Sequence, residues 1–278
     1  MSIARRDILG GALAAACSST LLGATPATPG DSRKSSTMNR CCTTVELRQY
    51  TLRGGRRDEL ISLFERAFIE PQEAVGAHVI GQFRDLDDPD RFVWLRGFDD
   101  MAARQRALTT FYGGPAWKAD RLAANATMLD SDNVLLLRPS RDQDGFEAAV
   151  REEAAERAVR RGVIAARIHY LDAPLVDAFA AFFETQMRPR IQADGARLLA
   201  RFVTETSANN FPALPIRDRE HVFVWFARFD DEAAERAFAE RASASSGWRD
   251  TATDTLLPAF MRKPEVLRLA PAEHSALR

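Results

Sequence analysis

FVWLRGFDD at Phe92–Asp100 recurs as FVWFARFDD at Phe223–Asp231, a shift in the numbering of 223 − 92 = 131. A match of this length predicts an internal repeat, and a repeat constrains the fold more strongly than any local pattern. The same shift carries Trp117 onto Trp248. The chain is therefore expected to contain two copies of one structural unit.

The shift between the copies is smaller upstream of this segment. RQYTL at 48–52 corresponds to RIHYL at 167–171, where the shift is only 167 − 48 = 119. Because the shift is larger further along the chain, the second copy should carry an insertion. We place it around 204–220, where FP and LPI stand among polar residues.

Hydrophobic periodicity gives each copy the order strand, helix, strand, strand, helix, strand. In the first copy an apolar helical stripe ends before Pro71, and DDPD at 87–90 is typical of a hairpin turn. The predicted elements are strand 45–52, helix 60–68, strands 78–84 and 92–98, a helix from Asp99-Asp100 to Leu108, a helical segment around Trp117 and strand 134–137. The second copy repeats this order, with a helix between Asp172 and Met187.

The order βαββαβ is that of a ferredoxin-like unit. Such a unit forms an antiparallel sheet with helices on one face, so its other face needs cover. We predict an α+β fold in which two ferredoxin-like βαββαβ repeats pack sheet to sheet and close one barrel within the chain. The predicted segments are a signal peptide at 1–27, a linker at 28–43 that includes Cys41-Cys42, repeat 1 at 44–140, a charged helical connector at 141–162, repeat 2 at 163–272 and a tail at 273–278.

The first part of the chain has the order of regions that a signal peptide requires. RR at 5–6 precedes an apolar run at 8–24 that glycine and serine interrupt. The arginine pair is similar to a twin-arginine signal and favours export to the periplasm. The run is too short and interrupted for a stable membrane span. Two alternatives stay open, a lipoprotein through Cys17 and a cytoplasmic protein if Met38 is the true start.

Composition excludes several classes of protein. The chain has 278 residues, 46% of them hydrophobic, and is expected to be globular. Lysine and arginine number 38 against 39 acids, which argues against nucleic acid as a partner. Every cysteine lies at or before Cys42, so we expect no thiol chemistry in the core. The histidines lack the spacing of zinc ligands, and we predict neither a metal nor a cofactor.

Three stretches together carry a family resemblance: VELRQYTLRGGRRDELISLFE from Val45, FVWLRGFDDMAARQRA from Phe92, and GPAW at 114–117. They resemble the NIPSNAP family, and the likeness extends from Val45 to Pro271. The resemblance implies the dimeric α/β barrel fold, here as two tandem copies. That superfamily holds cofactor-free oxygenases, isomerases, haem proteins and plain binding proteins, so it implies fold more securely than activity.

Alternation along the first strand places Glu46, Arg48 and Tyr50 on one face. Because both faces of the sheet are expected to be covered, these polar groups should line a space between sheet and helices. Arg48 and Tyr50 are the candidate catalytic groups, able to meet an anion or a carbonyl. The alternative, a purely structural Glu46–Arg48 ion pair, has equal weight.

The third strand places Trp94 and Arg96 on one face together with two phenylalanines, which suits a flat apolar ligand with a negative group. The phenylalanines and the repeated tryptophans also fit simple packing. His78 and His169 lie in strands without an evident acidic partner and are more typical of core histidines than of haem ligands. The Asp pairs before helices are expected to be N-caps rather than catalytic carboxylates.

We therefore expect an exported protein that binds a small, flat, partly apolar molecule in repeat 1, with turnover without a cofactor left open. The alternatives are haem binding through His169 or His78, and a scaffold whose insertion contacts a partner; further homo-oligomers stay open. The candidate ligand-binding residues are Glu46, Arg48, Tyr50, His78, Trp94, Arg96 and Trp117, followed with lower priority by Arg167, His169, Trp225 and Trp248 in repeat 2.

Overall fold

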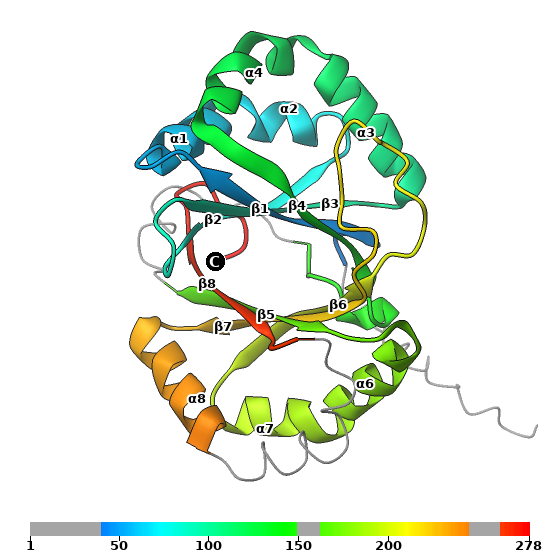
Figure 1. Cartoon of the computed structure of the whole chain (residues 1–278), viewed down its shortest axis with the longest axis vertical. Helices are drawn as coiled ribbons and strands as arrows, with labels where there is room; N and C mark the ends of the chain where they lie inside the picture. The colour runs from blue at the N-terminus through cyan, green and yellow to red at the C-terminus, as the bar shows by residue number, and fades with distance from the viewer. Residues whose placement is uncertain (1–39, 149–161, 245–261) are drawn as a thin grey trace, which may run out of the picture. The chain divides into compact units, whose positions relative to one another are not determined.

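The computed structural model describes residues 40–148, 162–244 and 262–278 (Figure 1). The predicted signal peptide, most of the predicted linker, the connector from residue 149 onward and Trp248 lie outside the described residues. Within the described ranges, every helix is too short or too polar to cross a bilayer.

The first half of the molecule runs from Thr44 to Pro139 and contains four strands and four helices among its described elements. These are β1 (Thr44–Leu52), α1 (Arg57–Ala67), α2 (Ile69–Glu73), β2 (His78–Asp85), β3 (Arg91–Phe98), α3 (Met101–Gly113), α4 (Pro115–Thr127) and β4 (Met128–Pro139). β2 and β3 pair as the predicted antiparallel hairpin, which confirms that part of the sequence analysis.

A short 3-10 helix, η1 (Asp142–Asp144), precedes the second half, which runs from Val163 to Pro271. Its elements are β5 (Val163–Tyr170), η2 (Ala173–Leu175), α6 (Val176–Phe182), the π-helical turn η3 (Phe183–Met187), α7 (Arg188–Ala193), β6 (Arg197–Thr204), β7 (Val222–Phe229), α8 (Glu232–Ala244) and β8 (Glu265–Pro271).

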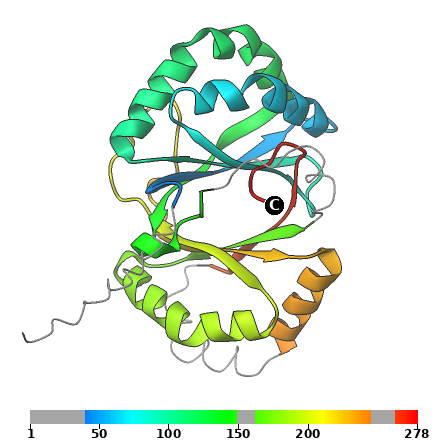
Figure 2. The ribbon, with the colours of Figure 1, turned by 180° about the vertical axis from the view of Figure 1, so that it is seen from behind.

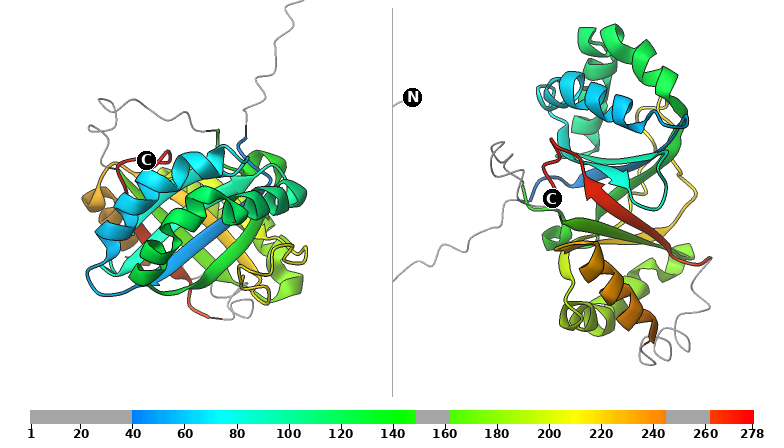
Figure 3. Two further views of the ribbon diagram at one scale, coloured as in Figure 1. Left: turned by 90° about the horizontal axis from the view of Figure 1, so that it is seen from above. Right: turned by 90° about the vertical axis from the view of Figure 1, so that its left-hand side faces the viewer.

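The strands close into one antiparallel barrel in the order β1-β3-β2-β8-β5-β7-β6-β4. Each half contributes four adjacent strands, and the barrel closes where β2 pairs with β8 and β4 pairs with β6. The helices of the first half cover one outer side of the barrel and those of the second half cover the opposite side (Figures 1 and 3). The molecule is thus an α+β barrel with two outer helical layers.

The barrel interior is an apolar core drawn from both halves. Val45 and Leu47 of β1 point inward and join Ile164 and Ala166 of β5 in one buried cluster. Alternation then forces Glu46, Arg48 and Tyr50 to the opposite face of β1, toward the helices of the first half. The interior core therefore explains why the polar face of β1 is directed outward.

Two local features agree with the sequence analysis and one differs. Asp100 Oδ1 accepts a hydrogen bond from Ala103 N at 2.6 Å, and Asp231 Oδ1 accepts one from Ala234 N at 2.8 Å, so both predicted N-caps are confirmed. Pro71, however, does not end a helix. It lies in the first turn of α2, where a missing N–H costs nothing because no intrahelical acceptor faces it.

The vicinal cysteines are part of the structure rather than a featureless linker. Cys41 and Cys42 form a disulfide, and Cys42 is buried in the interior core, although both were assigned to the linker. Gly97 of β3 faces it, and a Cβ at this position would overlap the side chain of Cys42. The sequence order alone did not indicate that the chain before β1 packs into the end of the barrel.

The predicted insertion is present between β6 and β7, and we define it as residues 205–221. It leaves the second half and runs beside α3 of the first half, as the yellow segment of Figure 2 shows. Glu205 N and Arg217 N donate to the carbonyls of Leu136 and Val134, so the insertion is bound to β4 at both of its ends.

Candidate functional site

A cluster of charged side chains lies between the sheet and the helices of the first half. Glu46 Oε2 accepts hydrogen bonds from Arg48 Nη1 and Arg96 Nε, both at 2.7 Å, and Glu46 Oε1 accepts one from Arg104 Nε at 2.7 Å. All four side chains are buried. Glu46 of β1 lies directly opposite Arg96 of β3 in the register of the two strands. The polar residues predicted on the first strand therefore meet those predicted on the third strand.

The cluster holds an excess of positive charge. Burial alone would raise the pKa of Glu46, but Arg96, Arg48 and Arg104 together hold that pKa well below its usual range. Burial lowers the pKa of Arg104 in spite of Glu46, yet an arginine keeps its proton in proteins. One carboxylate therefore faces three guanidinium groups, and two positive charges are not balanced within the cluster.

The remaining edges of the arginines hold polar side chains in place. Arg48 Nε donates to Tyr50 Oη at 2.9 Å, and Arg96 Nη1 donates to Gln72 Oε1 at 3.0 Å and to Tyr112 Oη at 3.4 Å. Burial raises the pKa of Tyr50, so its phenol is neutral and retains a proton that it can donate. These bonds fix two hydroxyls and one amide at the boundary of the cluster.

A small cavity of about 40 Å³ lies next to these polar groups. Its lining consists of Tyr50, Leu60, Phe64, Phe68, Gln72, Trp94, Phe111, Tyr112, Trp117, Ala124 and Met128. Nε1 of Trp94 is buried and has no hydrogen-bond partner among the described residues. The volume suits about two or three water molecules, so a larger ligand requires side chains of the wall to move.

The corresponding region of the second half is arranged differently. Trp225 Nε1 donates to His169 Nε2 at 3.1 Å, so the indole that corresponds to Trp94 is satisfied here. Burial, with a further contribution from Arg167, lowers the pKa of His169 to about 3. Trp225 thus occupies Nε2 of His169, and a haem iron could bind this nitrogen only after the hydrogen bond is broken.

The charges of the second half are also balanced differently. Glu235 of α8 lies 4.0 Å from Arg167 and accepts a hydrogen bond from Arg268 Nε at 2.7 Å. The shift in numbering that relates Phe92 to Phe223 also relates Arg104 to Glu235, and both residues lie one turn after an N-capping Asp. The acid lies on the strand in the first half and on the helix in the second.

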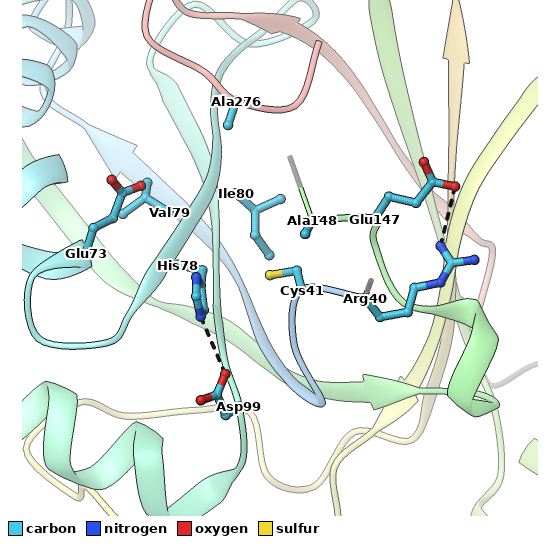
Figure 4. A pocket seen from close by; sticks show the side chains of 10 residues that line it. All are labelled: Arg40, Cys41, Glu73, His78, Val79, Ile80, Asp99, Glu147, Ala148 and Ala276. Carbon is cyan, nitrogen blue, oxygen red and sulfur yellow. Dashed lines mark ion pairs between the residues drawn. The ribbon is translucent and has the colours of Figure 1, made fainter. Parts of the chain in front are cut away.

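His78 is separated from the other candidates. It borders a different pocket of about 310 Å³ at one end of the barrel, where Cys41 and Arg40 also lie (Figure 4). His78 Nε2 lies 3.5 Å from Asp99 Oδ1, so the expectation that it has no acidic partner was wrong. The structure brings Glu46, Arg48, Tyr50, Trp94, Arg96 and Trp117 together around the cluster and its cavity, but not His78.

Sequence reasoning missed Arg104, Gln72 and Tyr112. A signal for Arg104 was present, because it falls on the stripe of α3 that also carries Ala107, Leu108 and Phe111, and a charged residue on a buried stripe needs a partner.

Comparison with known proteins now bears on this site. The NIPSNAP family model matches residues 45–143, which include the whole cluster and every residue of the cavity wall. The chain carries a NIPSNAP domain. The match covers the first half and ends before the second, and no curated protein matches the sequence.

Solved structures place this NIPSNAP domain in a known architecture. A monooxygenase candidate from Lactobacillus acidophilus has 12% identity and a TM-score of 0.51, with 82% of this chain and 93% of that chain covered. One from Fusobacterium nucleatum has 10% identity and a TM-score of 0.51, covering 82% and 91%. A NIPSNAP-like domain protein from Burkholderia xenovorans has 17% identity over 39% of this chain and 84% of its own, with a TM-score of 0.31. At these identities the likeness is one of fold.

Proposed function

We propose that the NIPSNAP domain binds a small, flat, partly apolar molecule in the cavity of the first half. The observation that carries the proposal is the combination of an aromatic wall with polar groups whose hydrogen bonds are incomplete, above all the buried indole N–H of Trp94. Aromatic side chains offer contact area to a flat ligand, and a few fixed polar groups select its orientation.

The asymmetry between the halves supports this location. The second half satisfies its tryptophan with His169 and faces Arg167 with an acid, whereas the first half keeps an unpaired indole and excess positive charge. We infer that the halves are tandem ferredoxin-like copies, of which the first retained the ligand site. Packing constrains both copies after a duplication, but ligand chemistry needs one pocket.

Turnover without a cofactor is the natural extension of this proposal. Arg48 and the neutral phenol of Tyr50 are hydrogen-bonded to each other, and Tyr50 lines the cavity. Together they can polarise a carbonyl or stabilise an oxyanion that develops there. Two solved structures of the same fold are monooxygenase candidates. Oxidation of an aromatic substrate is therefore the first class of reaction to test.

We also propose that the chain is exported, because RR at 5–6 precedes a short apolar run. Replacing both arginines by lysine should retain the precursor in the cytoplasm. Cell fractionation measures this, and unchanged export would refute the twin-arginine route.

Binding is tested with 2-naphthol as the probe and calorimetry as the measurement. Arg48→Met removes the charged donor that binds Tyr50 of the cavity wall while keeping approximate length, and Arg167→Met makes the same change at the corresponding position of the second half. We expect Arg48→Met to weaken binding roughly ten-fold to a hundred-fold, as for a lost hydrogen bond to a charged group. Arg167→Met should have little effect. Equal losses, or no binding by the unaltered protein, would contradict the proposal.

A further inference from the structure

Two buried arginines of the cluster keep a guanidinium nitrogen without a hydrogen-bond partner among the described residues. These atoms are Nη2 of Arg96 and Nη2 of Arg104, and both side chains are fully buried. Glu46 does not supply the missing acceptor, because it accepts hydrogen bonds from Arg48 Nη1, Arg96 Nε and Arg104 Nε and from neither Nη2. Unpaired donors on a buried cation are unfavourable, and an ion or ligand commonly completes such sites.

The outer edge of Arg104 is occupied by neutral oxygens from the other half. Arg104 Nη1 donates to Asn209 Oδ1 at 3.1 Å and to Asn210 Oδ1 at 2.6 Å, and both asparagines belong to the insertion (205–221). Both amide oxygens accept from the same nitrogen, Nη1, so this position of Arg104 already binds oxygen acceptors. Hydrogen bonds from arginine to an ionised oxygen are stronger than those to an amide, so an anion can compete for this edge.

The insertion also contacts the wall of the cavity. Phe211 stacks on Tyr112 with the ring centroids 5.8 Å apart, and Tyr112 both lines the cavity and accepts a hydrogen bond from Arg96 Nη1. Leu214 packs against the same small apolar cluster of the first half as Phe211. One segment of the second half thus contacts Arg104 and also supports Tyr112, which accepts a hydrogen bond from Arg96 and lines the cavity.

We propose that the ligand of the first-half cavity carries a carboxylate or a comparable small oxyanion. This group binds Arg96 and Arg104 and displaces Asn209 and Asn210. The insertion therefore moves away from Arg104 when an anion binds. The inference rests on the proposed function, because it concerns the anionic end of the molecule whose flat part occupies the aromatic cavity. It adds to the proposed function the arginines that bind the negative group of the ligand and the segment that moves when this group binds.

A matched pair of probes tests the charge. 2-Naphthoate and 2-naphthamide share the same ring and nearly the same shape, and they differ in whether the head group is an anion. Binding to the full chain is followed by calorimetry. We expect 2-naphthoate to bind roughly ten-fold to a hundred-fold more tightly than 2-naphthamide. Arg104→Met should abolish this preference, whereas Arg106→Met, an exposed arginine of the same helix, should preserve it.

The displacement of the insertion is tested separately, because Arg104→Met also removes a partner of Glu46 and can lower the stability of the protein. The double substitution Asn209→Ala and Asn210→Ala removes the two amide oxygens at Arg104 and keeps all four charged side chains of the cluster. It also removes the hydrogen bonds from Asn209 Nδ2 to Leu214 O and from Asn210 Nδ2 to Met101 O. It should tighten the binding of 2-naphthoate several-fold and accelerate its association, because the competing amide oxygens are gone. The binding of 2-naphthamide should change less.

The outcomes separate the two proposals. If neither probe binds, the aromatic cavity itself is not a ligand site, and the proposed function fails together with this inference. If both probes bind equally well, the cavity stands and the anion assignment is overturned. Unchanged or weaker binding of 2-naphthoate by the double asparagine variant would overturn the proposed displacement of the insertion.

Discussion

At the scale of single residues, the buried carboxylate of Glu46 governs the stability of the first half. Glu46→Gln would leave three buried guanidinium groups without a counter-charge, and we expect it to lower the free energy of unfolding by about 3–5 kcal/mol. Glu235→Gln is the matched control in the second half. Its loss should be smaller, because the side chains of Arg167 and Arg268 are each 20% exposed and Arg268 also pairs with Asp87. Urea unfolding measures both, and equal losses would contradict this account.

His169 predicts a pH dependence of stability at the same scale. Its folded pKa of about 3 is below the value of 6.5 that applies in an unfolded chain. Below pH 6.5 the unfolded chain therefore binds a proton that the folded protein does not, and stability falls as the pH is lowered toward 3. One such group contributes about 1.4 kcal/mol per pH unit well below its unfolded pKa. His169→Gln should flatten the decrease between about pH 6 and pH 5 in urea unfolding; an unchanged slope would show that His169 is not its source.

At the scale of elements, α3 and α8 show what one sequence pattern can and cannot specify. Both helices follow an Asp pair and begin with the same capping hydrogen bond, so their starts were predictable. The side chain that each presents to its strand has the opposite charge, Arg104 in α3 and Glu235 in α8. Both helices follow the same sequence motif, but each buries a side chain whose charge is opposite to that of the strand residue near it.

The insertion is the element that makes the halves unequal. It belongs to the second half by sequence, but Asn209, Asn210 and Phe211 all contact the first half. The site of the NIPSNAP domain is therefore completed by a segment outside the region that the family model matches.

At the scale of the whole molecule, the closed barrel makes each half depend on the other. The interior core joins Val45 and Leu47 to Ile164 and Ala166, so an isolated half would expose an apolar sheet face of a kind that soluble monomers avoid. We expect residues 44–140 alone to aggregate or to pair with themselves. Chromatography with circular dichroism measures this, and a soluble monomer that unfolds cooperatively would refute it.

The sequence by itself determined the strands, the capped helices, the position of the insertion and the polar face of β1. These features follow from repetition and from periodicities that burial imposes on neighbouring residues, which is why Glu46, Arg48 and Tyr50 could be assigned to one face.

The tertiary structure decided which groups meet that face. Arg104 is 58 residues from Glu46, and Asn209 is 105 residues from Arg104. No local pattern encodes such contacts, because they exist only after the barrel closes and brings a helix and an insertion from different halves over the same strand. The surroundings of Arg104, from which the charge of the ligand is inferred, are for this reason a property of the folded molecule.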